Sequence, residues 1–259
     1  LLAGLLCALL LHRRLRPGRD ILQGIKNNHF YVVYQPVVDA GTLQVSGAEV
    51  LLRWKHPIKG EISPNTFIPL AEAQKLMVPL TQHLFGLIAR DGEALQTVLP
   101  AGTKLGINIA TGHLHAASFI DDLDRLAASL PAQHFSIVLE ITERNMLKHG
   151  EAVTLFDRLH QKGYEIAIDD FGTGHSALIY LERFTLDYLK IDRAFVNAID
   201  MATTTSPVLD TVLMLAKRLN MGTVAEGVET AEQAKWLRAR GVNYLQGYYF
   251  CRPMTLTQL

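Results

Sequence analysis

IAIDDFGTGHSALIY, residues 166–180, is a short apolar strand pattern that ends on two adjacent carboxylates, Asp169 and Asp170. A loop that carries Gly172 and Gly174 follows, and a helical pattern comes after it. Two neighbouring aspartates at a strand end repel each other and lose solvation, so one or two divalent cations would relieve an unfavourable arrangement. On this stretch alone, a solvated turn that caps the next helix is the alternative explanation.

The rest of the chain alternates strand patterns with helical patterns. The strand patterns cover residues 31–38, 43–54, 104–109, 135–142, 165–169, 187–191, 222–226 and 243–247. The helical patterns cover residues 66–90, 120–130, 152–161, 176–181, 207–219 and 231–240, after a linker or entry helix at 17–28. Only residues 39–42 separate the first two strands, so these must run antiparallel, because a parallel pair needs a long crossover. The sequence predicts an α/β fold, an altered TIM (β/α)8 barrel with an antiparallel first strand pair.

Each predicted strand carries a polar side chain, and in all but the second strand it comes late. In chain order these residues are Gln35, Glu49, Asn108, Glu140, Asp169 with Asp170, Lys190, Glu226 and Gln246. Active sites of such barrels lie at the carboxyl ends of the strands, so we expect these side chains to meet at one mouth. Any one of them alone would be explained by a turn or a helix cap. Their presence on all eight strands favours a site.

The chemistry of this set points to hard cations. It holds carboxylates and amides but no histidine or cysteine, which suits Mg²⁺ or Mn²⁺ and argues against structural zinc. Asp169 is the natural ligand to bridge two ions, as in two-metal hydrolases. Lys190 would hold the attacking water or stabilise negative charge, and Arg53 would bind a phosphate. These features predict metal-assisted hydrolysis of a phosphoester, and the spacing does not name the substrate.

The composition excludes several other classes of protein. With 259 residues and 49% hydrophobic content, the chain can bury a full core. Lys plus Arg and Asp plus Glu are balanced at 25 each, so we expect no nucleic acid polymer as a partner. Cys7 and Cys251 have no disulfide-framework or zinc-like spacing, which fits a reducing compartment.

The first residues are apolar and are followed by a cluster of arginines. Residues 1–11 read LLAGLLCALLL, which is shorter than the roughly 20 residues that cross a bilayer, and Arg13, Arg14, Arg16 and Arg19 come next. We expect residues 1–19 to be the end of a transmembrane helix and a juxtamembrane arginine cluster, which would hold residues 20–259 on the cytoplasmic side. The alternative is an amphipathic helix packed on the domain.

Several motifs of the chain occur together in one known family. Glu49-Val50-Leu51 lies within EVLLRW, and YQPVV, INIA, LEITE, DDFGTG, LKID, AEGVE and QGYYF complete the set from about residue 22 to the end. On these motifs the chain resembles the EAL domain family of cyclic di-GMP phosphodiesterases. The resemblance implies an altered TIM barrel, hydrolysis of cyclic di-GMP to linear pGpG, and two Mg²⁺ or Mn²⁺ ions. It also implies that the chain is the cytoplasmic domain of a bacterial inner-membrane protein and that it forms a homodimer next to the DDFGTG loop.

The resemblance also assigns roles to individual residues. The first ion would be held by Glu49, Asn108, Glu140 and Asp169, and the second by Asp169, Asp170 and Glu226. Catalytic roles fall to Lys190, Glu226, Gln246 and Glu49, with Lys190 and Gln246 contacting the catalytic water. Gln35, Leu52 and Arg53 would bind the nucleotide, Glu143 would brace the DDFGTG loop, and Glu229 would support the site.

The chain departs from the family pattern at a few positions. Val50 replaces the alanine of the motif name, which affects packing and not the ligands, while His175 and Ala177 stand where the family often has tyrosine and serine. We expect the three histidines near the mouth, His113, His115 and His175, to be surface residues. Two other functions compete with the enzyme: a catalytically silent cyclic di-GMP receptor, and a signalling scaffold in which the barrel is only structural.

Overall fold

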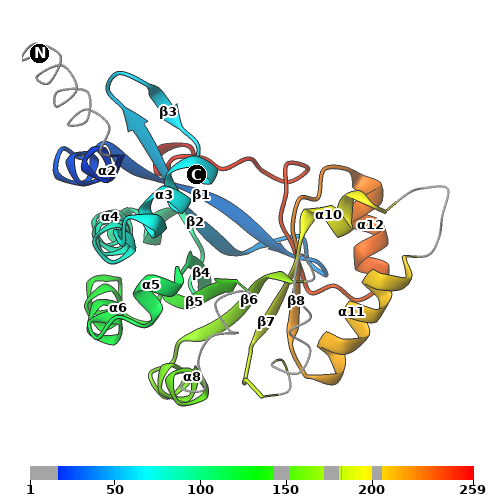
Figure 1. Cartoon of the computed structure of the whole chain (residues 1–259). Helices are drawn as coiled ribbons and strands as arrows, with labels where there is room; N and C mark the ends of the chain where they lie inside the picture. The colour runs from blue at the N-terminus through cyan, green and yellow to red at the C-terminus, as the bar shows by residue number, and fades with distance from the viewer. Residues whose placement is uncertain (1–16, 143–151, 172–180, 182, 200–205) are drawn as a thin grey trace, which may run out of the picture.

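The computed structural model describes residues 17–142, 152–171, 181, 183–199 and 206–259 (Figure 1). Its elements are α2 (Pro17–Lys26), β1 (Phe30–Asp39), β2 (Val45–His56), β3 (Gly60–Ile62), α3 (Pro64–Ala73), α4 (Met77–Val98), β4 (Thr103–Asn108), α5 (Thr111–Leu114), α6 (Phe119–Ser129), β5 (Phe135–Thr142), α8 (Ala152–Gln161), β6 (Glu165–Phe171), β7 (Tyr188–Ile191), α10 (Arg193–Asn197), α11 (Pro207–Arg218), β8 (Gly222–Ala225), α12 (Ala231–Ala239), β9 (Tyr244–Leu245) and the 3₁₀ turn η1 (Leu256–Gln258).

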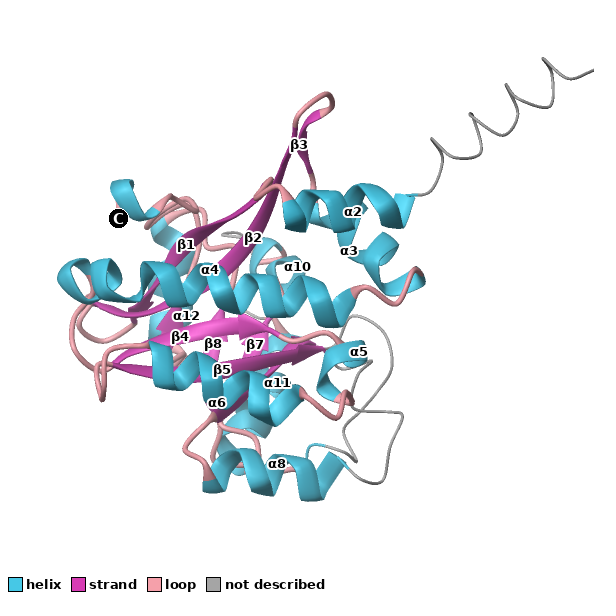
Figure 2. Cartoon of the chain, turned by 90° about the vertical axis from the view of Figure 1, so that its left-hand side faces the viewer, coloured by secondary structure: helices cyan, strands magenta, loops and turns pink. Residues whose placement is uncertain are grey.

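Eight strands close into a barrel in the order β1-β9-β8-β7-β6-β5-β4-β2, and β2 pairs back with β1. Strand β1 runs antiparallel to both of its neighbours, β2 and β9, whereas the pairs from β2 through β4 to β9 are parallel. The predicted barrel with an antiparallel first strand pair is therefore confirmed. The structure adds β3, a short strand that pairs with the end of β2 and projects beyond the barrel beside α2 (Figure 2).

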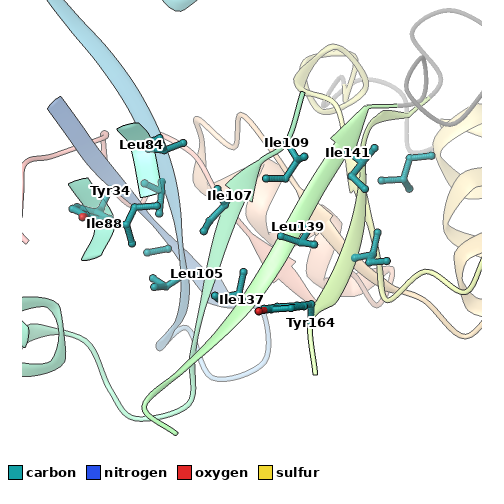
Figure 3. Packing of buried hydrophobic residues seen from close by; sticks show 14 of the residues in the cluster. Tyr34, Leu84, Ile88, Leu105, Ile107, Ile109, Ile137, Leu139, Ile141 and Tyr164 are labelled. Atoms are coloured by element: carbon teal, nitrogen blue, oxygen red, sulfur yellow. The ribbon is translucent and has the colours of Figure 1, made fainter. Parts of the chain in front are cut away.

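The side chains of the strands alternate between the helices and the barrel interior. The hydrophobic core contains Leu105 and Ile107 of β4 and Ile109, which directly follows β4 (Figure 3). It also contains Ile137, Leu139 and Ile141 of β5. Leu84 and Ile88 of α4 belong to the same core. The alternate residues Gly106, Val138 and Glu140 line the barrel interior instead. This alternation of side chains determines which polar groups face the site. It is hard to see in the sequence, because strands that are buried on both faces read as continuous apolar runs.

Buried His113 corrects one expectation of the sequence. Its side chain is fully buried on α5, and its Nε2 lies 2.9 Å from Oδ2 of Asp122 on α6. Gln82 of α4 and Ser118 also hydrogen-bond this oxygen at 2.9 Å each, and Arg125 pairs with the other carboxylate oxygen. Burial alone would raise the pKa of Asp122, but the hydrogen bonds from Gln82, His113 and Ser118 lower it. Asp122 therefore ties α4, α5 and α6 together, and His113 is not a surface residue.

Some expectations of the sequence fall on residues outside the described part. These are the apolar residues 1–11, the first three arginines, Glu143, and the loop with His175 and Ala177. His115 is described and is exposed, as expected. Within the described part, no helix combines the length and the apolar character that a membrane span requires.

Candidate active site

The barrel brings most of the sequence-predicted polar residues to one place. Glu49 lies on β2, Asn108 ends β4, Glu140 lies on β5, Asp169 on β6, Lys190 on β7, Glu226 follows β8 and Gln246 follows β9. The strand registers align them, since Gln35 stands opposite Glu49 and Asn108 stands opposite Glu140. Residues from both ends of the sequence therefore meet at the carboxyl ends of the parallel strands.

Lys190 lies at the centre of the carboxylates. Its Nζ is 2.5 Å from Glu140 Oε2 and 2.6 Å from Glu226 Oε1. Glu49 Oε1 and Asp169 Oδ1 lie 3.7 Å from the same nitrogen. One buried ammonium thus pairs with four carboxylates that come from four different strands or strand ends. We call these four carboxylates, from Glu49, Glu140, Asp169 and Glu226, the carboxylate cluster.

Amide side chains fix the orientation of Glu49. Asn108 donates to Glu49 Oε1 at 2.8 Å, and Gln246 donates to Glu49 Oε2 at 2.7 Å. The same Gln246 nitrogen lies 3.2 Å from Gln35 Oε1, and Gln35 donates to the carbonyl of Cys251 at 3.1 Å. Both carboxylate oxygens of Glu49 are therefore held by donors, which fixes its rotamer.

The buried charges shift the pKa values of the cluster. Burial raises the pKa of Glu226 to about 8, even though Lys190 opposes the shift, and it raises the pKa of Glu140 well above its ordinary value. Burial alone would lower the pKa of Lys190, but Asp169 and the other carboxylates raise it well above its ordinary value. Burial would also raise the pKa of Glu49, yet Lys190 and the amide donors bring it below its ordinary value. The directions of these shifts favour the charged forms of Lys190 and Glu49.

Gly106 makes room for Glu140. A Cβ atom at Gly106 would lie 2.2 Å from Glu140 Oε1, far inside van der Waals contact. Gly106 stands opposite Glu49 on β2 and opposite Val138 on β5. The next pair with the same side-chain direction on β4 and β5 is Asn108 and Glu140. This role was not predicted from the sequence, although a glycine inside the apolar run KLGINI is a signal for close approach.

A cleft of about 440 Å³ opens beside the cluster. Strand β2, the helices α3 and α4, and the segment after β4 form its walls. Leu52 and Arg53, which the family resemblance assigns to the nucleotide, are among its lining residues. Arg53 donates to the carbonyl of Leu52 at 3.0 Å. The polar side chains of Asn65, Glu72 and Thr81 also line the cleft and were missed. The sequence signal for the start of α3 is Ser63, which caps the helix, followed by Pro64.

A second, smaller cavity of about 50 Å³ lies inside the barrel. Glu49 and Glu140 line both this cavity and the cleft, whereas Lys190 and Gln246 line only the cavity. Gln246 is 3% exposed, and within the described part of the chain no group hydrogen-bonds its Oε1. The cluster therefore separates the cleft from a cavity into which Lys190 and Gln246 face.

Three predicted residues are not placed in the site. Glu229 is exposed in the turn before α12, where its N–H bonds Gln233, and no described contact ties its side chain to the cluster. Glu143 and the side chain of Asp170 lie outside the described residues. Their roles stay predictions.

The donor set fits a hard divalent cation. Four carboxylates and the Asn108 amide offer oxygen ligands without histidine or cysteine, the combination that Mg²⁺ and Mn²⁺ prefer. Among the described side chains, no three acidic, histidine or cysteine groups already stand in the arrangement of a metal site. Lys190 lies among the carboxylates instead and bonds the oxygens that would face an ion.

Fold and site together define an α/β barrel protein of the TIM type with a carboxylate-rich pocket at its mouth. More narrowly, the chain belongs to the EAL domain family, because the family model "EAL domain" matches residues 18–253.

Curated relatives and a solved structure resemble the chain over most of its length. The probable cyclic di-GMP phosphodiesterase PdeN of Escherichia coli K12 is 67% identical over 253 residues, which are 98% of this chain and 49% of PdeN. The cyclic di-GMP phosphodiesterase PdeL of the same organism is 39% identical over 89% of this chain and 64% of PdeL. The solved structure of the PaMucR phosphodiesterase in complex with c-di-GMP has a TM-score of 0.82 at 33% identity, over 94% of this chain and 99% of that one. The chain thus spans about half the length of PdeN.

Proposed function

We propose that this chain hydrolyses cyclic di-GMP to linear pGpG with the help of two divalent cations, Mg²⁺ or Mn²⁺. The observation that carries the proposal is the carboxylate cluster, which gathers four acidic side chains around one ammonium beside a cleft of about 440 Å³. The names of the relatives PdeN and PdeL, and the ligand of the PaMucR structure, support this substrate.

We assign the ligands of the ions from the cluster. One ion would bind Glu49, Asn108, Glu140 and Asp169, and the other would bind Asp169, Asp170 and Glu226. Bound there, the ions would neutralise the phosphate oxygens and lower the pKa of a water between them.

The remaining residues bind the substrate and orient the water. Lys190 Nζ and Gln246 Nε2 are donors next to Glu49 and would hold the attacking water in line with the phosphorus. Arg53 lines the cleft and would pair with a phosphate, while Leu52 and Gln35 would contact the nucleotide. Glu143 and Glu229 are proposed to support the loops around the site.

The test is direct. The purified protein is incubated with cyclic di-GMP and Mg²⁺, Mn²⁺ or EDTA, and the nucleotides are separated by chromatography. Glu49→Gln keeps the shape of the side chain but removes its charge, so hydrolysis should fall by more than the roughly 10- to 100-fold that loss of an outer-shell partner costs. The exposed Glu232→Gln on α12 is the matched control and should keep wild-type activity.

Other outcomes would point to another function. Tight binding of cyclic di-GMP by the wild-type protein without any pGpG in saturating Mg²⁺ and Mn²⁺ would identify a silent receptor. Absence of binding in calorimetry would identify a scaffold.

The homodimer and the attachment to a bacterial inner membrane are further proposals. They rest on the family resemblance and on the apolar residues 1–11 with the arginines that follow. Analytical ultracentrifugation of this chain tests the dimer, and fractionation of cells that express the full-length protein tests the attachment.

A further inference from the structure

We propose that the hairpin formed by β2 and β3 touches a lipid bilayer with its tip, where Ile58 inserts among the acyl chains and the neighbouring lysines bind headgroup phosphates. We call residues 55–60, which read KHPIKG, the hairpin tip. The inference goes beyond the proposed hydrolysis, and it rests on the proposed attachment of the protein to a membrane.

Ile58 is the most exposed of the large apolar side chains that the structure describes. It is 89% exposed, whereas the next one, Val208, is 59% exposed. Single apolar residues at a surface are common and need no explanation by themselves. Ile58 differs in its position, because β3 and the end of β2 project beyond the barrel beside α2 (Figure 2). An apolar side chain at the end of such a hairpin reaches a surface that the barrel itself does not touch.

A histidine fixes the turn that presents Ile58. Nδ1 of His56 accepts hydrogen bonds from the backbone N–H of Ile58 at 3.1 Å and from that of Lys59 at 3.2 Å. The ring of His56 packs against the buried Trp54, with 5.6 Å between the ring centroids. A tip that is ordered before it binds loses little conformational entropy on insertion. The hairpin tip is therefore a preformed projection.

The hairpin tip is joined to the first turn of α2. Lys59 Nζ donates to Asp20 Oδ2 at 3.1 Å. In the sequence, only residues 12–16 separate the apolar residues 1–11 from Pro17, where α2 begins. These five residues span at most about 18 Å, so a bilayer that holds residues 1–11 lies near the hairpin tip. The position of the tip thus favours a lipid surface as its partner.

The charges around the tip suit phospholipid headgroups. The exposed side chains that the structure describes on α2 are Arg19, Leu22, Gln23 and Lys26, and none of them is acidic. The tip adds the exposed Lys55 and Lys59, which face Glu61 on β3 and Asp20. Long basic side chains hold their charge at the phosphates while their stems lie along apolar groups. Basic and apolar groups in this combination are typical of interfacial membrane contacts.

Quenching of fluorescence by brominated lipids tests the contact. Ile58→Trp places an indole at the tip, and the chain is bound to vesicles of phosphatidylethanolamine and phosphatidylglycerol whose acyl chains carry bromine. An interfacial side chain lies about 5 to 10 Å deep, where headgroups meet acyl chains, so the added fluorescence should fall at least about twofold. The wild-type chain, measured in parallel, supplies the contribution of the buried Trp54 and the half-buried Trp236.

The matched control is Val208→Trp. Val208 is the next most exposed apolar side chain, and it lies on α11, away from β3 in both views (Figures 1 and 2). Its added fluorescence should not change with brominated lipid. Both variants should keep wild-type turnover of cyclic di-GMP in solution, because neither residue lines the cleft. Unquenched fluorescence of vesicle-bound Ile58→Trp, or equal quenching in both variants, overturns the inference.

The inference and the proposed function fail separately. A quenched tip in a protein that does not hydrolyse cyclic di-GMP would leave the membrane contact standing and refute the enzyme. Hydrolysis in solution by a chain that does not sediment with the vesicles would leave the enzyme standing and refute the contact at the tip together with the attachment.

Discussion

Substitution of Gly106 by alanine should damage the site much more than the fold. The added Cβ would lie 2.2 Å from Glu140 Oε1 and 3.1 Å from Glu140 Cδ, so the carboxylate must move by roughly 1 Å. That movement breaks the 2.5 Å contact with Lys190. A misplacement of about 1 Å in a reacting constellation can cost about 100-fold in rate. The group that must move is the end of a side chain and not backbone, so the free energy of unfolding should fall only by about 1 kcal/mol, the lower end for overpacking.

Two measurements separate these effects. Turnover of cyclic di-GMP in saturating Mn²⁺ reports the position of the carboxylate, and urea denaturation reports stability. Gly86→Ala is the matched control, because Gly86 is exposed on α4 with nothing within 4 Å of its added Cβ, so it should keep full activity and gain about 0.5 to 1 kcal/mol. Wild-type turnover in Gly106→Ala would refute the argument that the missing side chain positions Glu140.

Three further predictions concern stability and metal. The fold lowers the pKa of Asp122, so its contribution to stability is complete above its unfolded pKa and is lost as the pH falls towards its folded pKa. Asp122→Asn should therefore lower the free energy of unfolding by roughly 2 to 3 kcal/mol at pH 7 and make that free energy depend less steeply on pH in acid. A variant whose free energy of unfolding falls with pH in parallel to that of the wild type would contradict this. Tyr34 is fully buried and its hydroxyl donates to Asp91 at 2.9 Å, so Tyr34→Phe should cost about 1 to 2 kcal/mol in urea denaturation, with an unshifted midpoint as the opposing result. Dialysis against EDTA should abolish hydrolysis. Readdition of Mn²⁺ to 100 times its dissociation constant should raise the free energy of unfolding by about 2.7 kcal/mol. A melting temperature that does not change with Mn²⁺ concentration would contradict the presence of a metal site.

The local signals in the sequence were sufficient for the barrel. Only four residues separate the first two strands, so these strands must pair antiparallel. Strand and helix patterns alternate after them, which predicts parallel strands joined by helices. The rule that active sites of barrels lie at the carboxyl ends of the strands then predicts that Glu140 and Lys190 share one mouth, and the structure places them 2.5 Å apart.

Features that depend on partners distant in the sequence were not accessible in this way. His113 reads as a surface histidine until Asp122 and Gln82 are placed beside it, because nothing in its own neighbourhood reveals these partners. The role of Gly106 requires the register between three strands, and the three residues of β3 are too few to show a period. The walls of the cleft come from the surface of α3 and α4, whose sequence shows a helix but not which polar side chains border a ligand.

The reversed strand β1 also sets the order in which the molecule can be completed. Its Val38 pairs with Leu245, more than two hundred residues later, so a ribosome that has already released β1 and β2 needs roughly 10 to 40 s more to deliver β9. During that interval the nascent chain displays an unpaired edge on β1, and such edges are templates for aggregation. Expression at low temperature slows synthesis and lengthens this exposure, so we expect the yield of native protein to depend on chaperone supply as well as on stability.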